Sequence, residues 1–113
     1  MLARQRLPGD RVLLAEYRGN RVTERNRKGE IVWEKSLTLP LMAQRLPNGN
    51  TMIATAERVV ELTKKDKEAF SYAPPGGTRI MRARRLPGGD VLLALEDTTT
   101  NATRLTRVSR FGK

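Results

Sequence analysis

The sequence predicts an all-β protein in which one small structural unit is repeated. Two observations carry this prediction: a ten-residue segment occurs three times without a gap, and every copy combines turn-forming residues with an apolar run. The copies occupy residues 6–15, 45–54 and 85–94, so they begin 39 and then 40 residues apart. A fixed period of this size is typical of repeat architectures, and it therefore decides the fold class before any single element does.

Each copy begins with a turn followed by a strand. The proline fixes φ, the glycine, asparagine and aspartate positions accept positive φ, and a β-branched and apolar run follows. A second, less exact block predicts a further strand in each copy, at 21–24, 58–61 and 104–107. Polar turns come next, at 26–30, 63–67 and 109–113.

A fourth apolar piece completes the first two copies, at 31–34 and 68–72, and the third copy ends before it. With the strand expected ahead of each Arg-Leu-Pro motif, a complete copy holds four short strands in about 40 residues, which is typical of a β-propeller blade. We therefore expect one domain over 1–113. Blade 1 spans about 1–41, blade 2 about 42–80 and blade 3 about 81–113, the last without its fourth strand.

One segment favours a different structure when it is considered alone. Residues 56–70 are rich in Ala, Glu, Leu and Lys and would suit an amphipathic helix. The same columns in the other copies read Arg-Val-Thr-Glu and Arg-Leu-Thr-Arg. Because repeated units should share one conformation, we predict strands in this segment too.

The repeated unit resembles a known group of propeller blades. The runs Arg-Leu-Pro-Asn-Gly-Asn-Thr-Met-Ile-Ala at 45–54, Arg-Val-Val-Glu-Leu at 58–62 and Lys-Gly-Glu-Ile-Val-Trp-Glu at 28–34 resemble blades of bacterial quinoprotein-like and NHL-like propellers, including arylsulfotransferase-like proteins. The resemblance covers nearly the whole chain and implies the architecture only. Arylsulfotransferase chemistry relies on histidine, which this chain lacks, and no calcium or quinone constellation is recognisable. We expect no catalytic residue, no metal site and no cofactor.

The blade count raises the question of how the ring closes. Propellers have four to eight blades, and this chain supplies fewer than three complete ones. Two chains would give six blades, inside that range, and would satisfy the common two-fold symmetry of soluble oligomers. We therefore expect a homodimer that forms a six-bladed ring. The alternative that these residues are a piece of a longer propeller stays open.

Composition excludes several classes of function. The chain has 113 residues, no cysteine and no histidine, which rules out disulfides, thiol nucleophiles and Ser-His-Asp chemistry within it. The net charge is +10, so nucleic acid, anionic lipid or an acidic partner could bind. No apolar run approaches the length of a membrane span, and the charged start shows no signal peptide. As written, the chain is expected to be cytoplasmic, although its compartment stays open.

Two sets of residues stand out from the repeat. The first recurs with the fold and is predicted to be structural, through contacts between neighbouring blades: Arg6, Arg45, Arg85, Trp33 and Phe70. Glu24 and Glu61 recur as well and are candidate partners for these arginines. The second set stands where the copies disagree and is predicted to bind a phosphate, sulfate or carboxylate along the central channel: Arg4, Arg79, Arg82 and Arg84. A solvated basic rim is the alternative for the second set.

These observations predict a non-enzymatic binding or scaffolding module with a basic channel or face. Two alternatives remain at this point. The chain could be a nucleic-acid-binding protein, although its basic residues are spread over all three copies rather than gathered with aromatics in one groove. It could also be a fragment of a larger exported propeller enzyme whose catalytic residues lie elsewhere.

Overall fold

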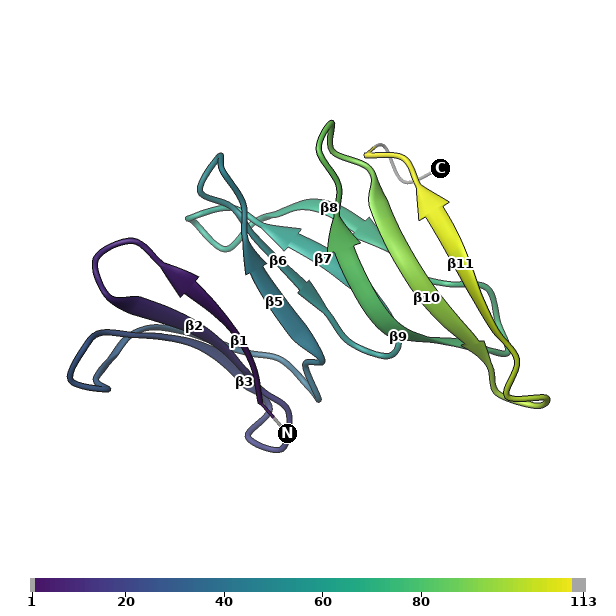
Figure 1. The fold of residues 1–113 in the computed structure, drawn as a ribbon, viewed down its shortest axis with the longest axis horizontal. Coiled ribbons are helices and arrows are strands. Elements are labelled where there is room, and N and C mark those ends of the chain that lie inside the picture. Colours follow the sequence, from purple (N-terminus) through teal and green to yellow (C-terminus); the bar gives the residue numbers. More distant parts are fainter. Residues whose placement is uncertain (1, 111–113) are drawn as a thin grey trace.

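The computed structural model describes residues 2–110, and this range folds into eleven strands and no helix. The strands form three antiparallel sheets that follow one another along the chain (Figure 1). The first sheet contains β1 (Leu2–Leu7), β2 (Arg11–Glu16), β3 (Arg21–Arg25) and β4 (Ile31–Ser36). The second contains β5 (Met42–Arg45), β6 (Thr51–Ala54), β7 (Val59–Leu62) and β8 (Glu68–Tyr72). The third contains β9 (Thr78–Arg85), β10 (Val91–Asp97) and β11 (Thr103–Val108).

The predicted all-β class is confirmed, and the helical reading of 56–70 is excluded. That segment forms β7 and β8, which pair antiparallel with Glu61 opposite Phe70. The segment forms short strands because each strand pairs with a neighbouring strand and packs against a neighbouring sheet. These interactions outweigh the local helix propensity. Residues 2–110 include no helix long and apolar enough to cross a membrane.

The Pro/Gly turns form the same hydrogen-bonded loop in the second and third sheets. In the second sheet the Leu46 N–H donates to the Asn50 carbonyl at 2.8 Å, and the Gly49 N–H donates to the Leu46 carbonyl at 2.9 Å. The third sheet repeats both bonds one period later. Gly49 has a φ of +90°, a conformation that side chains disfavour, so the turn requires glycine there. The recurring sequence therefore produces a recurring geometry.

The hydrophobic core lies between neighbouring sheets rather than inside any one of them. One cluster joins the first two sheets and the other joins the second and third. All four residues of β6 are buried, because the middle sheet is covered on both faces. In contrast, β2 and β10 alternate between buried and partly exposed residues, because each outer sheet is covered on one face only. Among the described residues, two sheet faces, one at each end of the arc, are consequently not covered by another sheet.

Candidate functional site

The first junction between sheets is held by one arginine that contacts three strands of the preceding sheet. Arg45 on β5 places Nη2 3.0 Å from Oε1 of Glu24 on β3. Its guanidinium carbon lies 5.8 Å from the ring centre of Trp33 on β4, a cation–π distance. Its backbone N–H donates to Oε1 of Gln5 on β1 at 2.6 Å. We call this arrangement of Arg, Gln, Glu and aromatic ring the arginine clasp.

The second junction repeats the arginine clasp with Arg85. Its Nη2 donates to Oε1 of Glu61, its guanidinium carbon lies 5.3 Å from the centre of the Phe70 ring, and its backbone N–H donates to Gln44 Oε1 at 3.3 Å. This ion pair is the more deeply buried of the two: the side chains of Arg85 and Glu61 are 12% and 10% exposed. The two clasps have the same arrangement because their members occupy the same columns of the repeat.

Arg6 occupies the same column as Arg45 and Arg85, and it lies on the first of the three sheets that the structure describes. It is exposed, and within residues 2–110 its side chain makes no hydrogen bond or ion pair. The structure thus brings together four of the five recurring residues, as the pairs Arg45 with Trp33 and Arg85 with Phe70. Within the described residues, no glutamate, glutamine or aromatic ring completes an arginine clasp around Arg6.

A second repeated contact joins the start of the second strand of each sheet, or the turn before it, to the third strand. In the third sheet the acidic and basic residues of this contact exchange places. The same two columns hold a basic or amide residue paired with an acid in the first two sheets and an acid paired with a base in the last. The pairs are Arg11 with Glu24 at 3.0 Å, Asn50 with Glu61 at 2.7 Å, and Asp90 with Arg107 at 2.8 Å. Sequence reasoning did not use this exchange, although aligning the columns of Glu24, Glu61 and Arg107 shows it.

The innermost strands β1, β5 and β9 line an open groove of about 500 Å³ that continues onto β10 and β11. Arg4, Arg82 and Arg84 line it, and no aspartate or glutamate does. All three arginines are exposed, and none makes an ion pair or side-chain hydrogen bond within the described part of the chain. The groove therefore presents unneutralised positive charge beside apolar surface from Leu92, Ala94 and Leu105.

Arg79, the fourth residue of the predicted anion-binding set, does not line this groove. Its Nε and Nη2 both donate to Oε1 of Glu96 on the neighbouring strand, at 2.9 and 2.6 Å. Arg79 lies opposite Glu96 and Arg82 lies opposite Ala94, two residues apart on β10, so both arginines are on the same face of the sheet at different positions along it. The bulge in the pairing of β9 with β10 lies between these two residues. A locally neutralised guanidinium is a poor candidate for binding an anion.

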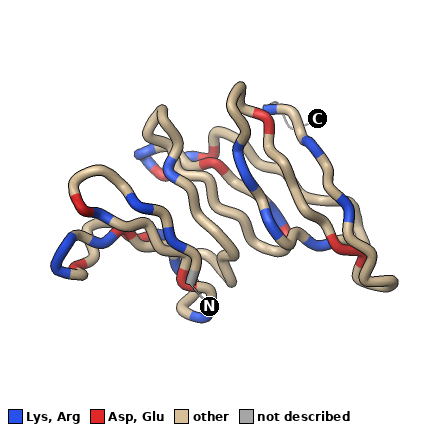
Figure 2. The backbone as a smooth tube through the Cα atoms, in the orientation of Figure 1, with Lys and Arg blue, Asp and Glu red and all other residues tan. Residues whose placement is uncertain are grey.

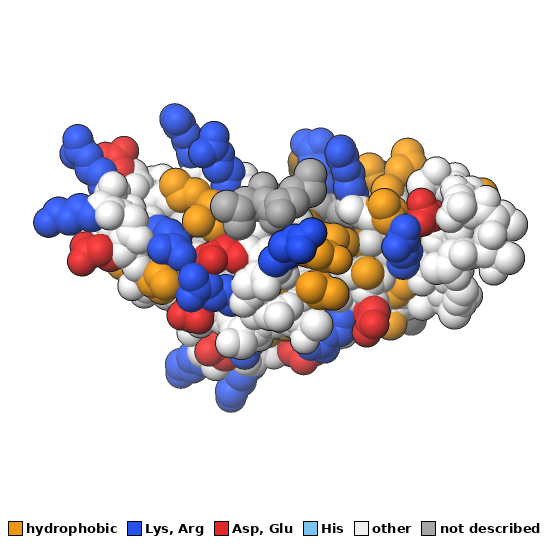
Figure 3. Space-filling view, turned by 90° about the horizontal axis from the view of Figure 1, so that it is seen from below, with side chains coloured by type: hydrophobic (Ala, Val, Ile, Leu, Met, Phe, Trp, Pro, Cys, Tyr) orange, Lys and Arg blue, Asp and Glu red, His pale blue; other side chains and the backbone are white. Residues whose placement is uncertain are grey.

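The remaining charge is dispersed. Basic positions recur along all three sheets, including β9 and β11 (Figure 2). On the face seen from below, Lys and Arg side chains alternate with acidic and hydrophobic ones and form no continuous band (Figure 3). This face does not have the concentrated charge of a typical nucleic-acid groove.

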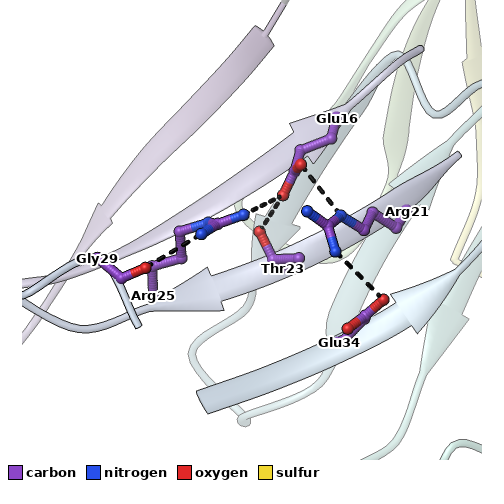
Figure 4. Close-up of polar contacts among 6 residues, drawn as sticks. All are labelled: Glu16, Arg21, Thr23, Arg25, Gly29 and Glu34. Atoms are coloured by element: carbon purple, nitrogen blue, oxygen red, sulfur yellow. Dashed lines mark hydrogen bonds and ion pairs between the residues drawn. The ribbon is translucent and has the colours of Figure 1, made fainter. Parts of the chain in front are cut away.

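The open face of the first sheet carries a polar network (Figure 4). The partly exposed Val12 and Leu14 lie on the same face. Glu16 accepts hydrogen bonds from Thr23 Oγ1 at 2.5 Å, Arg21 Nε at 3.1 Å and Arg25 Nη2 at 3.2 Å. Arg21 also lies 3.6 Å from Glu34 through Nη1 and Oε2. Burial raises the pKa of Glu16, but the hydrogen bonds from Thr23, Arg21 and Arg25 outweigh it and hold the pKa below its ordinary value.

The Glu16 network predicts a loss of stability in acid. Because the pKa of Glu16 is lower in the folded chain than the value of about 4.3 for a free glutamate, the unfolded state binds more protons. Its contribution is then fully present above that unfolded value and is lost as pH falls through the folded pKa. The urea midpoint should fall between about pH 6 and about pH 3, and less so in Glu16→Gln. Glu57→Gln, at an exposed carboxylate, should keep the original pH profile; equal profiles for all three proteins would contradict the prediction.

These features define the class of fold: within the described residues, three antiparallel sheets pack side by side in the manner of β-propeller blades. No protein-family model and no curated protein sequence matches the chain. Solved structures do match it. A protein of unknown function from Bacteroides caccae is similar over 91% of this chain and 38% of its own, with a TM-score of 0.75 and 22% identity.

Two further similar structures are enzymes. A streptogramin B lyase matches with a TM-score of 0.67 and 12% identity, over 96% of this chain and 40% of its own. A catalytically inactive histidine-to-alanine variant of virginiamycin B lyase from Staphylococcus aureus, solved with quinupristin, matches with a TM-score of 0.63 and 18% identity, over 94% and 40%. At these identities the similarity establishes the propeller fold, and the chain spans about two fifths of the length of each structure.

The comparisons correct one prediction and leave another unconfirmed. The prediction that the chain is not an enzyme is contradicted, because the same fold occurs in streptogramin B lyases. The prediction relied on the absence of histidine from the sequence. That absence excludes particular catalytic mechanisms in this segment, but it does not make a propeller non-catalytic. The particular resemblance to quinoprotein-like, NHL-like and arylsulfotransferase-like blades is not confirmed and stays a prediction.

Proposed function

We propose that the chain is a β-propeller module that binds an anionic ligand in the groove along β1, β5 and β9. One observation supports this most directly: Arg4, Arg82 and Arg84 line the groove without any carboxylate to neutralise them. Guanidinium groups offer paired donors that fit phosphate, sulfate or carboxylate oxygens. The ligand class is therefore a small anion or a molecule that carries one.

The apolar part of the groove adds a second requirement. Met42, Ala43, Leu92 and Ala94 line it together with the arginines. A ligand that combines an anionic group with an apolar body would use both surfaces, whereas a bare ion would use only the charge. We expect inorganic phosphate to bind weakly and an apolar phosphate or carboxylate ester to bind more tightly.

The lyase reaction is not part of this proposal. Replacing a histidine inactivates the virginiamycin B lyase described above, and these 113 residues contain no histidine. The groove thus holds no counterpart of that side chain. What the proposal takes from the lyases is the fold, which places inner strands around a channel where a ligand can sit.

Isothermal titration with inorganic phosphate at low ionic strength tests the proposal. Replacing Arg82 by alanine should weaken binding about three- to tenfold, because it removes one charge-assisted contact worth about 1 kcal/mol at an exposed site. Arg79→Ala is the matched control, since this arginine is on the same strand but pairs with Glu96 outside the groove. Equal weakening by both variants, or no binding to the original chain, would contradict the proposal.

A further inference from the structure

The third sheet has one open face, which we call the blade-3 face. It comprises the side chains that alternate with the buried ones on β9, β10 and β11: the ion-paired Arg79 and Glu96 with Thr103 at one end, and then Arg82, Arg84, Leu92, Ala94, Leu105 and Arg107. Their strand neighbours Ala83, Leu93 and Val108 are buried against the second sheet. We propose that the blade-3 face binds an acidic strand of a partner protein rather than a second copy of this chain. The inference deepens the proposed function, on which it rests through Arg82 and Arg84.

The blade-3 face keeps the apolar centre that a blade junction requires. Its apolar positions correspond to residues that the other two sheets bury completely in their junctions: Leu13 and Met52 for Leu92, Ala15 and Ala54 for Ala94, and Val22 and Val59 for Leu105. Leu105 is 72% exposed, whereas Val22 and Val59 are both at 0%. An apolar patch of this kind on a sheet face is typical of a surface that another element covers.

At two polar positions of the blade-3 face, arginine stands where the first two sheets have a hydrogen-bond acceptor. Arg84 replaces the clasp glutamine, Gln5 or Gln44, whose side-chain oxygen accepts a backbone N–H from the next sheet. Arg107 replaces the clasp glutamate, Glu24 or Glu61, which accepts from the next arginine. A guanidinium has no acceptor. Both acceptors have therefore become donors, and the arginine clasp cannot form on this face.

A second copy of this chain is the wrong partner for such a face. Its leading strand would bring Arg6 into the clasp column, against Arg84 and Arg107, so that like charges meet where the internal junctions pair opposite ones. The open face of the first sheet also differs from a junction face, because Arg25 stands where Leu62 and Val108 are buried. These charges oppose the six-bladed ring of two copies that the blade count predicts.

A partner strand that carries acids opposite the two arginines at the clasp positions fits this face. Carboxylates would pair with Arg84 and Arg107, and apolar side chains between them would cover Leu92 and Leu105. Arg107 is held towards Asp90 by its Nε at 2.8 Å, which leaves the other guanidinium nitrogens available to a carboxylate. Because alternate residues of a strand share a face, the fitting partner alternates acidic and apolar residues.

The probe is a synthetic peptide of alternating Glu and Val or Leu, with a matched peptide that has Gln in place of Glu. Fluorescence anisotropy should show the acidic peptide binding at least about tenfold more tightly, as expected when two charge-assisted contacts together supply about 1.4 kcal/mol. Arg107→Gln should remove most of that preference. Arg104→Gln is the matched control, because this exposed residue points to the opposite face of the same strand.

Two further variants keep the proposal distinct from phosphate binding and from misfolding. Arg4→Ala should weaken phosphate binding and leave peptide binding unchanged, whereas Arg107→Gln should do the reverse. Leu105→Ser changes an exposed side chain, so the variant should fold and bind the acidic peptide more weakly. If the chain does not bind phosphate but still prefers the acidic peptide, the proposed function is contradicted and this inference is not. If the chain binds phosphate but does not prefer the acidic peptide, this inference alone is contradicted.

Sedimentation equilibrium and nucleic-acid binding provide the remaining outcomes. The chain should sediment near its monomer mass of 12.7 kDa at micromolar concentration. A stable dimer that dissociates in Leu105→Ser would show that a second copy covers the face and would overturn the proposal. An oligonucleotide that binds more tightly than the acidic peptide, with the same dependence on Arg107, would overturn it in favour of nucleic acid.

Discussion

Replacing Glu61 by alanine should lower the free energy of unfolding by about 3–5 kcal/mol, the usual cost of removing one partner of a buried ion pair. The side chain of Arg85 is only 12% exposed, so its charge would lose its acid without gaining water. Arg85 Nε already lacks a hydrogen-bond partner among the described residues, and the Gly89 carbonyl that accepts from Nη1 is neutral and does not replace the lost carboxylate. Urea unfolding followed by the fluorescence of Trp33, the single tryptophan, measures the change.

Two controls separate the ion pair from the packing around it. Glu24→Ala breaks the equivalent pair at the first junction, where Arg45 is 26% exposed, so the loss should be smaller, about 1–3 kcal/mol. Combining Glu61→Ala with Arg85→Met replaces the pair by apolar groups and should recover much of the stability. A loss under about 1 kcal/mol in Glu61→Ala would show that the second arginine clasp does not stabilise the junction.

Replacing Leu93 by alanine should be of similar severity, with a loss of about 2.7–5 kcal/mol. Leu93 is completely buried in the cluster between the second and third sheets, and removing its side chain leaves a cavity there. Leu105→Ala is the matched control, since Leu105 lies on the same sheet and is 72% exposed. It should change the unfolding free energy by less than about 0.5 kcal/mol. An equal loss in both variants, growing with protein concentration, would mean that a second copy covers Leu105.

Both predictions concern residues at a junction between sheets, because a single layer of strands cannot enclose a hydrophobic core by itself. The middle sheet buries both faces, and the outer two bury one each. In repeat proteins, stability is approximately a sum of unit and neighbour terms. The same reasoning explains why the open faces are informative. One carries the Glu16 network, whose charged groups pair with one another, together with the exposed Arg4 and Arg6, and the other keeps Leu105 exposed among arginines.

Much of the fold could be predicted from the sequence because it depends on local chemistry that recurs. The Arg-Leu-Pro segments with their Gly, Asn and Asp positions determine turns, and the apolar runs after them determine strands. Repetition also decided against a helix over 56–70, where local propensity pointed the wrong way. The clasp arginines Arg45 and Arg85 were recognisable for the same reason, as residues that recur with the fold.

The site depended on tertiary structure. Arg79 and Arg82 look equivalent in the sequence, yet one pairs with Glu96 and the other lines the groove. The bulge between them keeps both on one face of the sheet, and they differ because strand pairing puts an acid opposite Arg79 and an alanine opposite Arg82, which composition does not show. The clasp partners lie 21 and 24 residues apart in the chain and meet only when sheets pack. Sequence by itself determined the repeated strands and turns; packing decided which face each charge occupies, because side chains alternate along a strand and only the neighbouring sheet selects the buried side.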